Sequence, residues 1–189
     1  MSHCGSRFEQ TVGLLRGIRP TILPSLLLCD FANLQREVER LEEAGVEVLH
    51  LDVMDGQFVP NMTYGMPIVE SLRRITSLKL DVHLMIATPK DYAKSFVQAG
   101  ADSITFHIEA EPKPSALLEE IRSMGVAAGL AINPSTPLDA VLPYVPKCDL
   151  VLVMSVEAGF GGQKFNPISL DRLRFLRQNF GPELLDRKS

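Results

Sequence analysis

Apolar, strand-like runs alternate along the chain with segments whose apolar residues recur at helical spacing. The apolar runs predict strands near residues 21–28, 46–54, 78–86, 102–108, 126–132 and 149–156. The segments between and after them predict helices near residues 31–44, 66–75, 89–99, 114–124, 136–145 and 169–179. Near-continuous Val, Ile and Leu runs are typical of parallel strands buried on both faces. The pattern therefore predicts an α/β protein with a parallel sheet.

Six strand–helix units fit either an open doubly wound sheet or a (β/α)8 barrel. A Rossmann sheet carries a glycine fingerprint after its first strand, but residues 22–28 read Ile-Leu-Pro-Ser-Leu-Leu-Leu. The glycine-rich loop follows the sixth strand instead, and polar residues gather at several strand ends, where barrel enzymes place their chemistry. We expect a TIM-type barrel with about six units present. Residues 1–18 form an N-terminal extension, and residues 19–189 form one incomplete barrel domain.

Composition and charge narrow the class of protein. Of the 189 residues, 46% are hydrophobic and 22% are charged, and the formal net charge is −4, as in a soluble globular enzyme. The chain has no dense Lys/Arg run, so we expect no nucleic-acid or membrane partner. No apolar stretch approaches the roughly 20 residues of a membrane span. Cys4, Cys29 and Cys148 are scattered, which indicates reduced thiols and a cytoplasmic location.

The strand near 46–54 carries two polar residues on one face. His50 and Asp52 are two positions apart, so both point into the interior of a barrel. An imidazole and a carboxylate in apolar surroundings are costly to bury unless they pair with each other or bind a metal. A purely structural hydrogen-bonded pair is the alternative hypothesis.

The next two predicted strands supply further histidines. His83 lies near the end of the strand after His50 and could complete a His-Asp-His set. Such a set suits Zn²⁺, Fe²⁺, Mn²⁺ or Co²⁺ better than Ca²⁺ or Mg²⁺, so we expect one divalent metal ion. His107 is a weaker candidate, which could instead line the mouth or orient a ligand.

Methionines and glycines also fall at strand ends. Met54, Met85 and Met154 could fill gaps in the core or keep a metal site dry. The segment Gly159-Phe160-Gly161-Gly162 follows the sixth strand. Glycines there would let backbone N–H groups approach a phosphate, although a flexible connection is the alternative.

Four motifs of this chain resemble the ribulose-phosphate 3-epimerase family. The likeness runs from about residue 19 to 180 and rests on Pro24-Ser25, His50–Asn61, Asp81–Met85 and Gly159–Phe165. It implies a TIM-barrel isomerase of carbohydrate metabolism. The enzyme would interconvert D-ribulose 5-phosphate and D-xylulose 5-phosphate in the pentose phosphate pathway, by metal-assisted proton transfer at C3 through an enediolate.

The resemblance also implies roles for individual residues. His50, Asp52 and His83 would bind one divalent metal ion, and Asp52 would also act as the catalytic acid/base. Ser25 and His83 would contact the substrate. The remaining implied residues are those of a phosphate-binding loop, Gly159, Phe160, Gly161 and Gly162, and those lining the enediolate, Met54, Met85 and Met154.

The sequence departs from the family pattern near its end. The family's second catalytic carboxylate, also a metal ligand, belongs to a Val-Asp-Gly-Gly segment on strand seven, and no such segment occurs here. Asp186 is not a match, because Asp-Arg-Lys-Ser surrounds it. With strands seven and eight missing, we expect the strands near 21–28 and 149–156 each to keep one unpaired edge. Smaller departures are Ala158 for a usual proline and Cys29 for a usual small residue.

Alternative functions remain at this point. One is epimerisation of a related ketose phosphate, D-allulose 6-phosphate, and another is an impaired, truncated remnant that binds metal or phosphate without turnover. A decarboxylase or lyase on a similar barrel would need a lysine among the carboxylates, which the strand ends do not supply. In each case the expected partner is a small sugar phosphate, and a homo-oligomer is possible.

Overall fold

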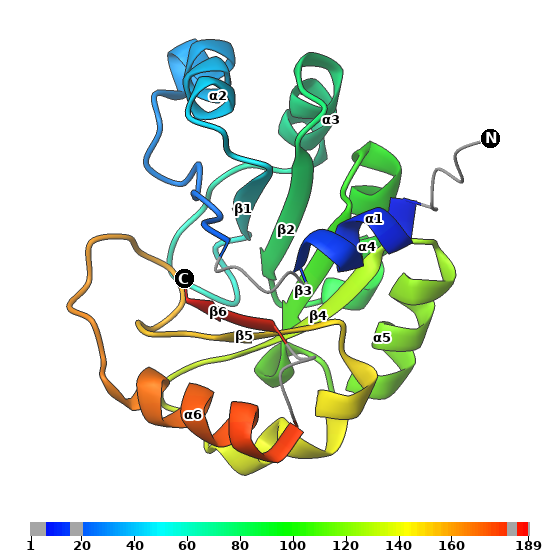
Figure 1. Cartoon of the computed structure of the whole chain (residues 1–189), viewed down its shortest axis with the longest axis vertical. Coiled ribbons are helices and arrows are strands. Elements are labelled where there is room, and N and C mark those ends of the chain that lie inside the picture. Colours follow the sequence, from blue (N-terminus) through cyan, green and yellow to red (C-terminus); the bar gives the residue numbers. More distant parts are fainter. Residues whose placement is uncertain (1–6, 16–20, 181–184, 189) are drawn as a thin grey trace.

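The computed structural model describes residues 7–15, 21–180 and 185–188. Within these residues six parallel strands form one curved sheet in chain order (Figure 1). The strands are β1 (Val48–Met54), β2 (Lys79–Met85), β3 (Ser103–His107), β4 (Ala127–Ile132), β5 (Leu150–Val153) and β6 (Leu185–Lys188). Every neighbouring pair is parallel, which confirms the predicted sheet type.

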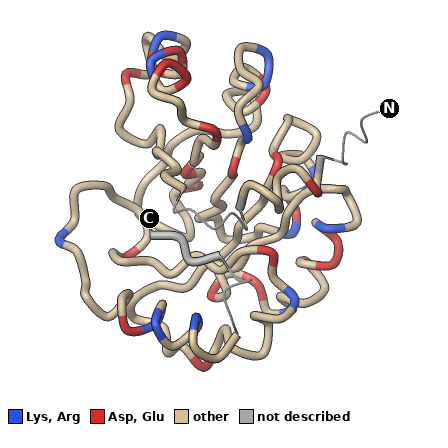
Figure 2. The backbone as a smooth tube through the Cα atoms, viewed as in Figure 1, with Lys and Arg blue, Asp and Glu red and all other residues tan. Residues whose placement is uncertain are grey.

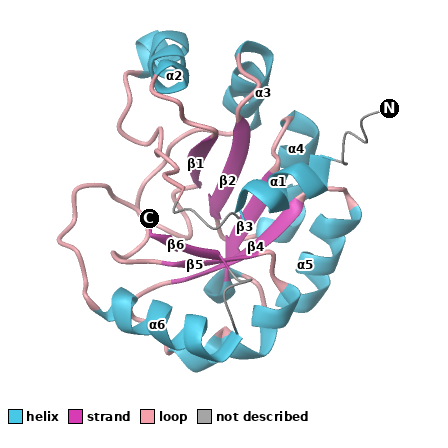
Figure 3. Ribbon diagram, viewed as in Figure 1, coloured by secondary structure: helices cyan, strands magenta, loops and turns pink. Residues whose placement is uncertain are grey.

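The α-helices are α1 (Arg7–Leu15), α2 (Leu34–Glu43), α3 (Met66–Ile75), α4 (Pro89–Ala99), α5 (Pro114–Ser123) and α6 (Ile168–Phe180). Helices α2 to α6 lie around the outside of the sheet, as Figure 3 shows, whereas α1 lies beside the start of β4. The short 3-10 helices are η1 (Phe31–Asn33), η2 (Ile108–Ala110), η3 (Leu138–Ala140) and η4 (Leu142–Lys147). Apolar side chains of the strands and helices form one main core between the two layers.

The strand predicted near 21–28 does not form. This segment makes a single parallel bridge, Ser25 opposite His50. The His50 N–H donates to the Pro24 carbonyl at 2.9 Å, and the His50 carbonyl accepts from Leu26 at 3.1 Å. Proline has no N–H to give to a ladder, so an apolar run that contains Pro24 pairs only locally.

The expected free edge near 149–156 is also wrong. β6 pairs with β5 from Leu150 opposite Leu185 to Val153 opposite Lys188. Asp186 therefore lies in β6, opposite Val151. The residues of β6 read Leu-Asp-Arg-Lys, a short charged segment without the apolar run by which the other strands were predicted.

Two helical segments differ from the prediction. The helix predicted near 136–145 is instead η3 and η4, because Pro143 and Pro146 cannot donate the hydrogen bonds of a continuous α-helix. α1 lies in the N-terminal segment, where no helix was predicted, and its Val12 packs against Ala127 at the start of β4. Cys4 lies outside the described residues.

Charged positions lie mainly on the outer elements. Figure 2 shows acidic and basic residues of both signs on α2, α3 and α6. In the described ranges, no helix is both long and apolar enough to span a membrane. Cys29 is partly exposed and Cys148 is buried, and both are free thiols, as predicted.

Candidate metal centre

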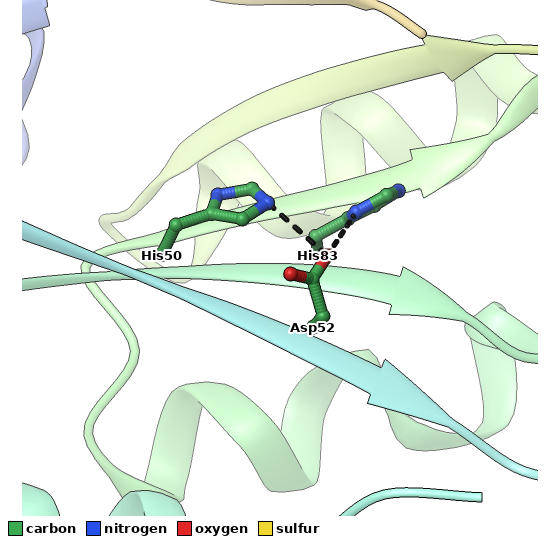
Figure 4. Close-up of side chains that lie close together, drawn as sticks. All are labelled: His50, Asp52 and His83. Atoms are coloured by element: carbon green, nitrogen blue, oxygen red, sulfur yellow. Dashed lines mark hydrogen bonds and ion pairs between the residues drawn. The ribbon is translucent and has the colours of Figure 1, made fainter. Parts of the chain in front are cut away.

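The register of β1 and β2 brings three predicted metal ligands together. Asp52 pairs with His83, and His50 pairs with Asp81. Because paired residues of a parallel sheet point to the same face, the side chains of His50, Asp52 and His83 converge (Figure 4). One ligand atom from each of the three lies within 4.8 Å of the others. All three residues are buried.

Asp52 is the central member of this group. Its Oδ1 lies 2.9 Å from His83 Nδ1 and 3.3 Å from His50 Nε2. Its Oδ2 accepts a hydrogen bond from the Ser25 hydroxyl. Ser25 is itself held by the β-bridge with His50, so the segment 21–28 places this side chain at the site although it forms no strand.

His50 is arranged as a metal ligand would be. Its Nδ1 lies 2.8 Å from Asp81 Oδ2, and the other oxygen of Asp81 accepts from the Ser103 hydroxyl. Its Nε2 is buried and forms no hydrogen bond with any described residue. A ligating histidine commonly gives its second ring N–H to a carboxylate, which leaves the first nitrogen for the metal. The group of three can therefore hold a divalent metal ion.

His107 lies behind His83 and outside the converging group. Its Nε2 is 2.9 Å from His83 Nε2, and its Nδ1 is 3.1 Å from Glu109 Oε2. The two imidazole rings are stacked, with centroids 5.0 Å apart. His107 was considered either as a metal ligand or as a residue that orients a ligand. Its contact with His83 supports the second role.

Burial and neighbouring charges shift the pKa values of the cluster. Burial lowers the pKa of His50, but its contacts with Asp52 and Asp81 outweigh burial and raise it to about 10. Burial raises the pKa of Asp52, and contacts with His50 and His83 outweigh it and lower the value below the usual range. For His83, burial dominates and lowers the pKa to about 4. Asp52 is thus ionised, as a metal ligand must be.

A cavity of about 480 Å³ opens beside the cluster. Every residue to which the family resemblance assigned a site role lies on its wall: Ser25, His50, Asp52, Met54, His83, Met85, Met154, Gly159, Phe160, Gly161 and Gly162. Met54 and Met85 also pack against Val59, while Met154 packs against Leu152. The methionines therefore fill small apolar clusters and line the cavity at once.

The glycine loop at the rim is fixed by several contacts. Gly159 has φ 126° and Gly162 has φ 73°, both in the left-handed region that disfavours other residues. A Cβ at Gly159 would lie 3.2 Å from the Val59 side chain. The Asn61 amide donates to the Gly159 carbonyl at 2.6 Å, and the Gln163 amide donates to the Phe160 carbonyl at 2.9 Å.

The sequence interpretation assigned no role to Asp81, Ser103 or Glu109. Each of these side chains contacts a histidine or its carboxylate partner in the interior. A signal was available for Asp81, because it lies two positions before His83 and so shares its face. Glu109 also lies two positions from a histidine, His107, but it falls beyond the end of β3, in η2, where the alternation of a strand no longer places the side chain.

A family match covers most of the chain. The model of the ribulose-phosphate 3 epimerase family matches residues 21–187. The ribulose-phosphate 3-epimerase of Synechocystis sp. is 49% identical over 159 residues, covering 83% of this chain and 69% of that protein. The ribulose-phosphate 3-epimerase, cytoplasmic isoform, of Oryza sativa subsp. japonica is 45% identical over 163 residues, covering 84% of this chain and 72% of that protein.

Solved structures agree on the fold. The crystal structure of phospho-2-dehydro-3-deoxyheptonate aldolase from Thermotoga maritima aligns with a TM-score of 0.62 and 15% identity, over 84% of this chain and 48% of that one. Fold and comparisons together define a TIM-barrel-type enzyme of the isomerase class that acts on sugar phosphates. The chain belongs to the ribulose-phosphate 3 epimerase family.

Proposed function

We propose that this chain interconverts D-ribulose 5-phosphate and D-xylulose 5-phosphate, a step of the pentose phosphate pathway, at the cavity beside β1 and β2. One observation carries the proposal: the only carboxylate of the converging group, Asp52, faces the same cavity as the glycine loop at residues 159–162. A sugar phosphate could then present its carbon chain to Asp52 and its phosphate to the loop. The cytoplasmic isoform among the relatives supports a cytoplasmic location.

The metal proposal rests on the donor atoms present. His50 Nε2, Asp52 Oδ1 and His83 Nδ1 would hold one divalent ion, either Zn²⁺, Fe²⁺, Mn²⁺ or Co²⁺, since two nitrogens and one oxygen suit these ions. When bound, such an ion supplies positive charge that stabilises negative charge developing on the substrate oxygens. The buried His50 Nε2, which has no hydrogen-bond partner among the described residues, supports this assignment.

Asp52 would move the proton at C3. That proton lies next to a ketone, so the electrons of the broken C–H bond pass into the C2 carbonyl and give an enediolate. Asp52 takes the proton on one face of the carbon, and the epimer forms when a solvent proton is added on the opposite face, since a proton returned by Asp52 only regenerates the substrate. The Ser25 hydroxyl holds Asp52 Oδ2, which fixes the orientation of the carboxylate, and Ser25 and His83 would also contact the substrate.

The remaining cavity residues would position the substrate and keep water out. Backbone N–H groups of the loop Gly159–Gly162 would donate to the phosphate, because the glycines leave the backbone accessible. Met54, Met85 and Met154 are all buried and would give the enediolate an apolar wall. Electrostatic interactions are stronger in such a water-poor site than in water.

Proton exchange and epimerisation can be measured separately. D-ribulose 5-phosphate is incubated with the protein and each of the four metals in D₂O, and loss of the C3–H signal is followed by NMR. Formation of D-xylulose 5-phosphate is followed in a coupled assay, with D-allulose 6-phosphate as the competing substrate. We expect both signals from D-ribulose 5-phosphate. Asp52→Asn should reduce both by about 10²–10⁴-fold, as expected for a lost general base.

The control is Asp171→Asn, whose side chain is 78% exposed on α6, and it should leave both rates unchanged. Exchange without epimerisation would identify an impaired site that carries out only the Asp52 half of the reaction. Faster turnover of D-allulose 6-phosphate would reassign the substrate. If neither exchange nor epimerisation occurs with any of the metals, the proposal fails.

A further inference from the structure

A chain of close polar contacts runs from the candidate metal centre to η2, which follows β3. It begins at Asp52 Oδ1, 2.9 Å from His83 Nδ1, and continues from His83 Nε2 to His107 Nε2, also 2.9 Å apart. It ends at His107 Nδ1, 3.1 Å from Glu109 Oε2. His83 and His107 are 1% and 0% exposed, so these contacts are shielded from solvent.

The order of donors along this chain is set at Glu109. A carboxylate only accepts, so His107 Nδ1 carries the proton and donates it to Glu109. The Asn133 amide nitrogen is also near His107 Nδ1, at 3.4 Å, but the nearer and charged carboxylate makes the stronger partner. With its proton on Nδ1, neutral His107 offers a lone pair at Nε2. His83 must therefore donate from its own Nε2.

This order leaves His83 Nδ1 as an acceptor that faces another acceptor. His83 Nδ1 and Asp52 Oδ1 lie 2.9 Å apart, and two acceptors at that distance repel unless a proton or a metal cation lies between them. A divalent ion bound to both atoms satisfies every group in the chain while both imidazoles stay neutral. The hydrogen-bond order set at Glu109 thus prepares His83 Nδ1 as a ligand.

Glu109 is itself fixed by its other oxygen. Oε1 accepts from the Asn133 N–H at 2.9 Å and from the Thr136 hydroxyl at 2.5 Å. The loop that carries these donors is held by Arg172 of α6, which donates to the carbonyls of Asn133 and Thr136 at 2.8 and 2.7 Å. The carboxylate therefore cannot turn away from His107 without breaking two hydrogen bonds.

We propose that Glu109 and His107 are positioning residues that hold His83 in the tautomer able to bind a divalent metal ion through Nδ1. The proposal deepens the proposed function and rests on its metal site. Partners of this kind typically change metal affinity by about 10–100-fold.

The test is Glu109→Gln, which keeps the size and shape of the side chain. The Asn133 N–H still requires an acceptor, so the amide oxygen of the glutamine stays on that side and its NH₂ group faces His107. His107 must then accept at Nδ1 and donate from Nε2, and His83 must accept at Nε2 and carry its proton on Nδ1. We expect Zn²⁺ affinity, measured by competition with a chromogenic chelator, to fall about 10–100-fold. ¹⁵N NMR should show His107 changing from the Nδ1–H to the Nε2–H tautomer.

Two control variants separate positioning from structural support. Glu111→Gln makes the same change at another carboxylate. The Glu111 side chain accepts from the Lys113 N–H and forms no hydrogen bond with a histidine among the described residues. Thr136→Val removes one hydrogen bond to Glu109 but leaves its contact with His107. Both should keep Zn²⁺ affinity within about two-fold of the parent. If Glu109→Gln fails to fold, His107→Phe replaces it, because phenylalanine keeps a ring beside Phe58 but offers no acceptor to His83.

The outcomes are distinct. An unchanged His107 tautomer in Glu109→Gln overturns the proposal, as does a changed tautomer with unchanged Zn²⁺ affinity. If Thr136→Val loses as much Zn²⁺ affinity as Glu109→Gln, Glu109 only supports the loop and the proposal is overturned. The proposal is also overturned if the parent protein does not bind Zn²⁺. If the Zn²⁺ affinity and the His107 tautomer change as expected but the protein does not turn over the substrate, the proposed reaction is wrong and the positioning role of Glu109 and His107 still holds.

Discussion

On β1, β2 and β3 most of the buried inward positions are polar, the exceptions being Val48, Met54 and Met85, whereas on β4 and β5 the corresponding positions are small or apolar. The polar set is His50, Asp52, Asp81, His83, Ser103, Thr105 and His107. The other set is Ala127, Gly129, Ala131, Leu150 and Leu152. The two halves have the same parallel pairing and the same depth of burial, so backbone structure does not explain the difference.

The difference shows how one interior can serve two purposes. In the polar half, hydrogen bonds between side chains offset the cost of removing polar groups from water. In the apolar half, the absence of a side chain at Gly129 makes room for Thr105 of the polar half, and Leu152 lines the cavity. We therefore expect substitutions of hydrogen-bonded residues in the polar half to change both stability and metal binding, and substitutions in the apolar half to change stability alone.

Asp81→Ala should have the largest effect. It would leave the buried His50 Nδ1 and the Ser103 hydroxyl without their acceptor, and breaking a buried charged pair costs about 3–5 kcal/mol of unfolding free energy. Urea unfolding measures the loss, and the rise in melting temperature on adding Zn²⁺ should disappear with it. Asp81→Asn keeps one acceptor oxygen for His50 and should lose less. A cost under about 1 kcal/mol for Asp81→Ala would contradict the inferred role of the network.

Leu150→Ala is the matching test in the apolar half. Leu150 is 1% exposed, and truncating a buried leucine typically costs about 2–5 kcal/mol of unfolding free energy. The shift in melting temperature on adding Zn²⁺ should stay at the parent value, because Leu150 contacts no member of the His-Asp-His group in the described contacts. A loss of that shift would show that the two halves are coupled.

The strands β1 to β5 and the helices α3 and α4 were the more predictable parts of the fold. The boundaries of α3 and α4 match the predicted 66–75 and 89–99, because each has proline in its first turn and α4 ends at Gly100. The run at 21–28 looked like a strand because it is apolar, but in the structure only Leu26 of this run is buried, while Ile22 and Leu28 are 81% and 80% exposed. β6 was missed because four residues with three charges carry no such signal.

Only part of the candidate site could be predicted from the sequence, and the reason is physical. Spacing of two along a strand places His50 beside Asp52, and equal depth on neighbouring strands adds His83. The partners of these residues depend on register between strands, which the sequence does not display. Asp81 contacts His50 only because β2 is paired with β1 at that register, and Glu109 depends on the turn after β3.

Gly129→Ala should test the boundary between the two halves. A Cβ at Gly129 would lie 2.3 Å from Thr105 Oγ1 and 3.1 Å from the Leu150 side chain. Overpacking of this kind costs about 1–3 kcal/mol of unfolding free energy. Thr105→Ala in the same protein should recover part of the loss, since it removes the colliding oxygen. Costs that simply add in the double variant would show that the collision is relieved elsewhere.

Thr105→Val should have the smallest effect and the opposite sign. Thr105 is 0% exposed, and its Oγ1 forms no hydrogen bond within the described part of the chain, unlike the network around it. A buried hydroxyl without a partner costs about 1–3 kcal/mol, and valine replaces it with a methyl group of similar size. We expect unfolding free energy to rise by about 1 kcal/mol and Zn²⁺ affinity to stay unchanged. Thr105→Ser, which keeps the hydroxyl and loses the methyl group, should be less stable than the parent. If valine destabilises the protein instead, the hydroxyl takes part in the interior network, and the polar half extends to its boundary with Gly129.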